Sequence, residues 1–191
     1  MILAFDVGNT ETTVGLFAGS ALRAHWRVNT DPSRTPDEIG MLIDGLLRAQ
    51  KVKHDDVDGA VIGSVVPAVT GPLAEACHAI LGVRARVVDA RSPLPITLAV
   101  DEPNTVGADR LINTLAASRM YKADTIVVDL GTATTYDCIT AEGVFLGGII
   151  APGLRTSADT LIRRTPSCRR QSSCRPSARS AAAPRSASAP A

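Results

Sequence analysis

The sequence predicts an α/β fold built in two halves, and three observations support this prediction. Short apolar runs rich in β-branched residues, typical of buried strands, occur in both halves of the chain. Between them lie stretches with apolar residues at helical spacing, which is the alternation expected of layered α/β proteins. An Asp-x-Gly turn followed by hydroxyl residues begins at Asp6 and again at Asp129, and this repetition indicates an internal duplication.

The N-terminal half is predicted to open with a meander of three strands joined by short turns, and two further strands follow later. Pro67 is expected to end the fourth strand. The five predicted strands cover residues 2–7, 12–18, 22–28, 59–66 and 85–88.

The first helix carries a strong start signal. Thr35 suits the N-cap, Pro36 the first helical position, and Glu38 completes a capping box. A second helix is predicted over residues 69–81. Residues 89–105 are proline-containing and read as a loop, and the next helix is predicted from Asp109 to about Tyr121, joining the two halves. One face of the first helix is apolar and is expected to pack on the sheet: Ile39, Leu42, Ile43, Leu46 and Leu47.

The C-terminal half is predicted to begin with the second hairpin, residues 125–137, followed by a strand over 144–150 and a helix over about 155–162. Residues 163–191 differ in composition, because they contain seven Arg, seven Ser, seven Ala and four Pro and no acidic or aromatic residue. Such a segment cannot bury a core, so we expect it to be disordered.

Composition and charge exclude several classes of function. No run approaches the roughly 18 apolar residues of a membrane span, and no basic leader opens the chain. The four cysteines lack metal-site spacing, so a reducing cytoplasm is expected. Residues 1–162 hold 13 basic and 19 acidic residues, a formal charge of −6, which argues against nucleic acid as a partner.

Each hairpin has the chemistry of a phosphate site. Gly131 lets the backbone approach a ligand closely, and backbone N–H groups with the hydroxyls of Thr132, Thr134 and Thr135 can surround phosphate oxygens. Asp129 would repel a phosphate directly, so it fits a bound cation or an ordered water beside it. The alternative is a plain β-hairpin in which threonine simply favours strands. Two such hairpins facing each other across a cleft would hold a nucleoside triphosphate.

With these motifs in view, the chain resembles the type III pantothenate kinases over about residues 1–162. The resemblance implies an actin-like, sugar-kinase-like ATPase fold of two RNase-H-like lobes that form a homodimer when intact. It also implies transfer of phosphate from ATP to pantothenate, the first step of coenzyme A biosynthesis, with a divalent cation (Mg²⁺) and a monovalent cation (K⁺ or NH₄⁺). Four motifs carry it, in the family's order: residues 6–10, 107–110, 129–135 and 147–153.

The resemblance assigns roles that physical chemistry supports. Asp129 would hold the monovalent cation. Asp109 is the candidate base for the pantothenate hydroxyl, although a carboxylate at a helix start is also favoured by the helix dipole alone. Arg110 would pair with the pantothenate carboxylate, although a structural ion pair would look identical in sequence. The predicted ATP-binding residues are Asp6, Val7, Gly8, Asn9, Thr10, Glu11, Thr12, Thr13 and Thr132. The predicted substrate-binding residues are Gly107, Ala108, Asp109 and Arg110.

The sequence departs from the family after about Leu161, where the composition changes and the expected rest of the second lobe is not recognisable. We therefore expect a first lobe over residues 1–115, an incomplete second lobe over 116–162, and an out-of-frame or truncated tail over 163–191. On this reading the chain beyond about residue 120 is poorly folded and its kinase activity is negligible, because two complete lobes are needed to close on the phosphates.

Two other functions compete. One is a different phosphotransferase of the same superfamily, against which the motif at residues 107–110 argues. The other is a non-catalytic transcriptional accessory protein, whose basic tail could contact nucleic acid through phosphates. That tail has no aromatic residues to stack on bases, which disfavours this function.

Overall fold

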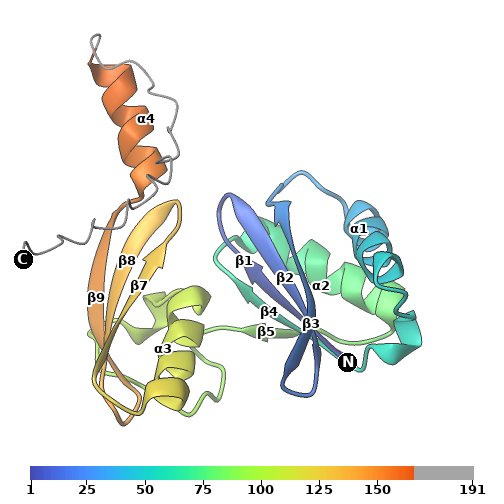
Figure 1. The fold of residues 1–191 in the computed structure, drawn as a ribbon, viewed down its shortest axis with the longest axis horizontal. Helices are drawn as coiled ribbons and strands as arrows, with labels where there is room; N and C mark the ends of the chain where they lie inside the picture. Colours follow the sequence, from blue (N-terminus) through green and yellow to red (C-terminus); the bar gives the residue numbers. More distant parts are fainter. Residues whose placement is uncertain (166–191) are drawn as a thin grey trace, which may run out of the picture.

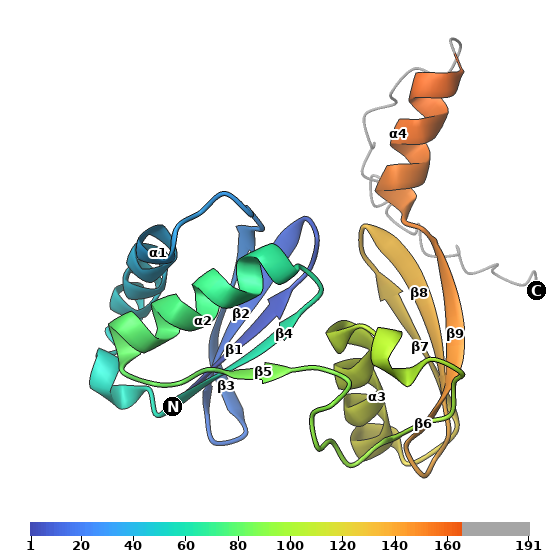
Figure 2. The same cartoon turned by 180° about the vertical axis from the view of Figure 1, so that it is seen from behind.

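Two β-sheets of different size lie side by side in the computed structural model, which describes residues 1–165 (Figure 1; Figure 2). The first sheet contains β1 (Ile2–Val7), β2 (Glu11–Ala18), β3 (Ala21–Asn29), β4 (Gly59–Ser64) and β5 (Arg86–Val88). Their order is β3-β2-β1-β4-β5; the first three strands are antiparallel, and β4 and β5 continue the sheet parallel to β1. The predicted meander and both later strands are thus confirmed.

Two helices, α1 (Pro36–Ala49) and α2 (Pro67–Leu81), pack against one another and against the first sheet. Alternate residues of β1 and the apolar face of α1 meet in one core that also takes in β2, β4 and α2. This is the packing that strand alternation and helical spacing predict. One prediction is corrected: Pro67 opens α2 directly, two residues before the helix was expected. Proline suits the first turn of a helix because the N–H it lacks would have no intrahelical partner there.

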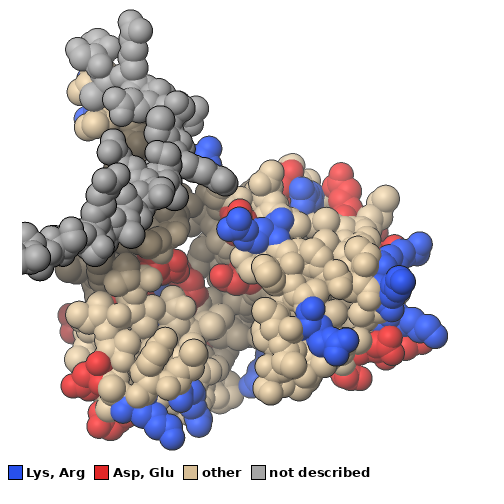
Figure 3. Space-filling model, in the orientation of Figure 1, with Lys and Arg blue, Asp and Glu red and all other residues tan. Residues whose placement is uncertain are grey.

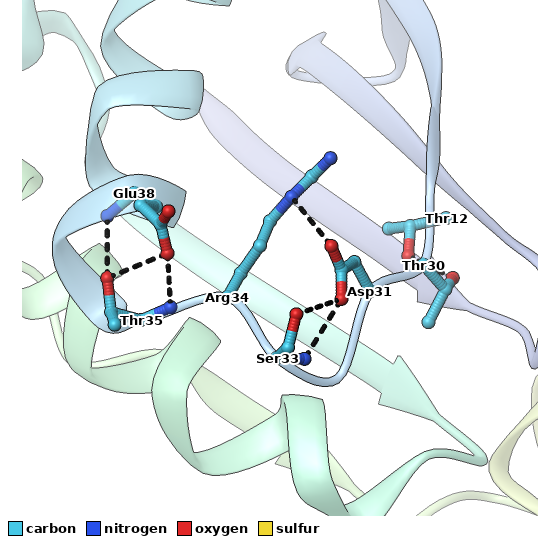
Figure 4. A network of polar contacts seen from close by, with 7 residues as sticks. All are labelled: Thr12, Thr30, Asp31, Ser33, Arg34, Thr35 and Glu38. Atoms are coloured by element: carbon cyan, nitrogen blue, oxygen red, sulfur yellow. Dashed lines mark hydrogen bonds and ion pairs between the residues drawn. The ribbon is translucent and has the colours of Figure 1, made fainter.

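The start of α1 is built as the sequence predicts (Figure 4). The backbone N–H of Glu38 donates to Thr35 Oγ1 at 3.3 Å, and Glu38 Oε2 accepts from the backbone N–H of Thr35 at 2.8 Å. In the preceding turn, Asp31 Oδ1 accepts from both the backbone N–H and the hydroxyl of Ser33. The bonds between Thr35 and Glu38 satisfy donors that a helix start leaves without partners, and those of Asp31 fix the turn before it.

The segment predicted as a loop, residues 89–105, contains a short strand, β6 (Thr97–Leu98), and a 3₁₀ turn (Pro103–Thr105). β6 runs parallel to β9 (Val144–Pro152) and so belongs to the second sheet. A strand of two residues is too short to show the alternation of apolar and polar residues that predicts strands. Thr97 and Leu98 form a strand because the fold places them beside β9. The loop prediction was therefore wrong at these positions.

Helix α3 (Ala108–Tyr121) lies between the two sheets and contacts β4 together with β7 (Thr125–Leu130) and β8 (Ala133–Ile139). Ile112 of α3 packs directly over Gly63 of β4, where the missing side chain leaves room for the isoleucine. The predicted helix is confirmed, and it connects the two halves. The proposed division at residue 115 falls inside it and stays a prediction.

The second sheet has the order β6-β9-β8-β7, with β7, β8 and β9 antiparallel, and helix α4 (Leu154–Arg164) follows β9. α4 extends to Arg164, into the first residues of the predicted tail; basic residues in a last turn suit the helix dipole. The rest of that tail, from residue 166, lies outside the described residues. Within residues 1–165 no helix is long and apolar enough to cross a membrane.

Candidate active site

The two repeated hairpins meet face to face. The turn after β1 and the turn after β7 come together between the sheets, where Thr10 Oγ1 and Thr132 Oγ1 lie 2.8 Å apart in a hydrogen bond. Each turn is closed by a backbone hydrogen bond. The N–H of Gly8 donates to the carbonyl of Glu11 at 3.1 Å, and the N–H of Gly131 donates to the carbonyl of Ala133 at 2.9 Å. The duplication seen in sequence therefore becomes the two walls of one site.

A cleft of about 700 Å³ lies between these walls, a size suited to a nucleotide or similar ligand. Figure 3 shows acidic side chains where the two halves face each other. The sequence-predicted residues that line the cleft are Asp6, Gly8, Asn9, Thr10, Glu11, Thr13, Asp109, Asp129 and Thr132.

Two members of the predicted ATP-binding stretch do not line the cleft. Val7 is only 1% exposed and belongs to the core of the first sheet. Thr12 is 7% exposed, and its hydroxyl is hydrogen-bonded to that of Thr30 at 2.8 Å. Successive strand residues point to opposite faces, so a continuous run of residues cannot all face one ligand.

Three of the five carboxylates that line the cleft influence one another: Asp6 of β1, Asp109 of α3 and Asp129 of β7. The pKa of Asp6 is raised, first by its burial and then by the negative charges of Asp109 and Asp129. A cation would relieve this repulsion. Within residues 1–165 no three acidic, histidine or cysteine side chains gather as a metal cluster. A cation held here would therefore share its coordination with phosphate oxygens and water, as Mg²⁺ commonly does.

The residues of the motif at 107–110 have different roles at the start of α3. Gly107 is the N-cap of α3, and Asp109 Oδ1 accepts from the backbone N–H of Arg110 at 2.8 Å. A Cβ at position 107 would stand 2.5 Å from that oxygen, so glycine is needed for this carboxylate position. Ala108 is buried. Of the four residues, Asp109 is the one that lines the cleft.

Arg110 points instead to the second sheet. Its Nε donates to Asp137 Oδ1 at 2.7 Å, its Nη2 lies 2.6 Å from the same oxygen, and its guanidinium stands 5.0 Å from the centre of the Phe145 ring. The structural ion pair that the sequence left open is thus present. A role for Arg110 in substrate binding stays a prediction.

Helix α4 adds residues that sequence reasoning did not assign to the site. Arg155, Thr156 and Asp159 line the cleft from its first turns. Thr156 Oγ1 and the backbone N–H of Gly153 both donate to the carbonyl of Thr132, at 2.8 and 3.0 Å, so the helix start is tied to the phosphate turn. The available signal was the glycine-led helix start directly after β9. Gly131 and Thr135, which the sequence placed beside phosphate, also line the cleft, whereas Thr134 does not. The other lining residues not assigned from sequence are Arg27, Val65, Leu130 and Ala133.

Fold and cleft together define a class: the chain has the actin-like ATPase fold, in which a ligand cleft lies between two lobes. A solved structure from Sinorhizobium meliloti, described as a candidate 2-dehydro-3-deoxygalactonokinase, matches with a TM-score of 0.52 at 14% identity. The match covers 86% of this chain and 57% of that one. At this identity the likeness concerns the fold alone.

Sequence comparison is more specific. The family profile described as type III pantothenate kinase matches residues 2–188. A type III pantothenate kinase of Roseiflexus castenholzii is 43% identical over 163 residues, covering 85% of this chain and 64% of that protein. One of Rubrobacter xylanophilus is 42% identical over 165 residues, covering 86% and 62%. The chain belongs to the type III pantothenate kinase family. It spans somewhat under two thirds of the length of these curated relatives.

Proposed function

We propose that this chain provides the ATP and acceptor sites of a kinase that phosphorylates pantothenate to 4′-phosphopantothenate, the first step of coenzyme A biosynthesis. The observation that carries the proposal is the meeting of the two hairpins, bonded through Thr10 and Thr132, around a cleft that also contains Asp109. Membership of the family supports the choice of acceptor. By the same resemblance we propose a homodimer.

ATP would bind with its phosphates between the hairpin turns. Backbone N–H groups of the turns and the hydroxyls of Thr10, Thr13 and Thr132 are donors of the kind that hold phosphate oxygens. Arg155, on the first turn of α4, adds a positive charge to the same wall. Phosphoryl transfer needs this positioning and charge neutralisation more than covalent chemistry from the protein.

The acidic cleft fits the cations that the family implies. Asp129 and Asp6 would take part in holding a monovalent cation and Mg²⁺. The pKa of Asp6 is raised by burial and by the charges of Asp109 and Asp129, so an added positive charge beside these carboxylates would be favourable. When bound, these cations neutralise the phosphate charge. The carboxylates thereby become compatible with an anionic ligand beside them.

Asp109 would act as the general base. It lies at the N-terminal turn of α3, in the cleft between the hairpins, where an acceptor hydroxyl can approach the terminal phosphate. The carboxylate takes the hydroxyl proton while the acceptor oxygen bonds to the γ-phosphorus, and the bond from that phosphorus to the bridging oxygen of ADP breaks.

The first test is binding by the chain itself. Calorimetry should show MgATP and pantothenate binding to the full chain, and a panel of sugars should not compete with pantothenate. Preferential binding of a sugar would assign the cleft to another kinase of the same fold.

The second test is turnover in a chimera that joins residues 1–162 to the remaining part of the Roseiflexus castenholzii relative. The chimera should form 4′-phosphopantothenate, and Asp109→Asn should lower turnover by about 10²-fold or more with little change in ATP affinity. Asp101→Asn, an exposed carboxylate near the same helix, is the matched control. Turnover that survives Asp109→Asn would remove Asp109 from the mechanism.

A further inference from the structure

A buried ion pair joins α3 to the second sheet immediately beside the candidate base. Within residues 1–165, Asp137 is the only carboxylate whose side chain is fully buried, at 0% exposed. Its partner, Arg110, follows Asp109 in sequence and retains 15% side-chain exposure. A ligand can therefore reach this pair only from the arginine side.

The guanidinium is fixed from several directions. Nε and Nη2 converge on one oxygen, Asp137 Oδ1, at 2.7 and 2.6 Å, and the ring of Phe145 lies 5.0 Å from the guanidinium carbon. Gly148 makes room for the pair, because a Cβ there would stand 2.7 Å from Nη2 and 2.9 Å from Oδ1. These contacts use one edge of the planar guanidinium and leave the Nη1 edge for another anion.

Stability alone does not explain the pair. Taking two charges out of water is costly, and apolar residues of similar volume often replace a buried pair without loss of stability. Here Asp137 Oδ2 is buried and accepts no hydrogen bond from residues 1–165, so the carboxylate is only half used. A pair of this kind gives a fixed orientation rather than a large gain in folding free energy.

We propose that Asp137 is a positioning residue of the acceptor site, which holds the Arg110 guanidinium beside Asp109 so that its free edge receives the carboxylate of the acceptor. This inference rests on the proposed function, since pantothenate carries the hydroxyl to be phosphorylated at one end and a carboxylate at the other. Asp109 and Arg110, adjacent in sequence, would then serve the two ends of one substrate.

Removing Asp137 should change the affinity for an acceptor carboxylate in opposite directions, depending on whether Asp137 positions Arg110 or acts only through its negative charge. If Asp137 acted only as a negative charge, its removal would leave Arg110 more attractive and tighten binding of an acceptor carboxylate. If it positions Arg110, its removal lets the long side chain leave its place and weakens binding. Positioning therefore predicts weaker binding of the carboxylate and no change for an acceptor that lacks it.

The experiment compares the full chain with Asp137→Asn by calorimetry, using pantothenate, its uncharged alcohol analogue and MgATP. The Kd of pantothenate should rise about tenfold, which corresponds to about 1.4 kcal/mol, while the Kd values of the alcohol and of MgATP stay unchanged. Asp101→Asn should alter none of the three. Unchanged or tighter pantothenate binding in Asp137→Asn would overturn the proposal.

Loss of MgATP binding in Asp137→Asn would reveal that this variant is misfolded. A second variant then tests the proposal independently. Phe145→Leu removes the ring beside the guanidinium without unpairing a charge and keeps an apolar side chain in the core position. It should also weaken pantothenate binding selectively, by about two- to threefold, since the guanidinium loses its cation–π contact. Equal affinity for pantothenate and its alcohol in the unaltered chain would overturn the positioning role alone. Failure of the unaltered chain to bind either acceptor would overturn the proposed function and this inference with it.

Discussion

At the scale of single residues, the cleft gathers negative charge where a phosphate ligand is proposed to bind. The pKa of Asp6 is raised by its burial and by the negative charges of Asp109 and Asp129. Such an arrangement is unfavourable in the absence of a counter-charge and favourable with one. The proposed cations would supply that counter-charge beside Asp6 and Asp129, while Asp109 is the proposed base.

Asp129→Ala should therefore abolish activation by potassium or ammonium. In the chimera described above, turnover of the unaltered protein should rise when KCl replaces choline chloride, and the variant should show equal turnover in both salts, because the cation has lost its carboxylate ligand. Asp159→Ala removes another cleft carboxylate, on α4, and should keep the potassium response. A potassium response that persists in Asp129→Ala would place the cation elsewhere.

How well the sequence predicted these residues depended on their local setting. Asp6, Asp109 and Asp129 each sit at the end of a readable element, so their approximate position followed from strand and helix signals. Asp137 and Arg155 gave no such signal. The strand position of Asp137 was readable, but its burial against Arg110 depends on how α3 crosses the sheet. Arg155 reaches the cleft only because Gly153 ties α4 to the turn at Thr132.

At the scale of elements, the start of α1 offers a test of stability that is independent of function. Thr35→Ala removes the side-chain acceptor of the Glu38 N–H, so the free energy of unfolding should fall by about 1 kcal/mol. Urea denaturation at pH 7 measures it. Ser33→Ala, in the preceding turn, removes a hydroxyl that bonds outside the helix and should cost less. Equal losses in the two variants would show that the capping box adds nothing beyond a surface hydrogen bond.

The elements that could be predicted are those with strong local signals. The hairpins are marked by turn residues, the first helix by its capping residues, and the strands and helices by their apolar periodicity. Each of these signals can be read from neighbouring residues without knowledge of the tertiary fold. β6 does not, because its two residues become a strand only through their pairing with Val144 and Phe145. The same limit explains Val7 and Thr12, where a contiguous motif was assigned to the ligand although strand alternation turns these two side chains away from it.

At the scale of the whole molecule, the two sheets are supported unequally. Within residues 1–165, the core of the first sheet contains sixteen buried apolar residues, whereas the cluster at the second contains three, Ala117, Ile139 and Phe145. On the second sheet large apolar side chains remain exposed, including Leu130 at 71% and Ile149 at 67%. Because burial of apolar surface is the main source of folding free energy, the second sheet should open at lower cost than the first.

Hydrogen exchange measured by mass spectrometry can test this inequality with a matched pair of strands. β1 and β8 are each paired on both sides, so a difference between them reflects packing rather than hydrogen bonding at a sheet edge. Amides of β8 should exchange at least about tenfold faster than those of β1, and MgATP should slow β8 exchange because a ligand held between both hairpins stabilises the closed, folded second sheet by mass action. Equal protection of β1 and β8 would contradict the unequal support. Slow exchange in β1 with no response of β8 to MgATP would instead mean that the nucleotide contacts the first hairpin alone.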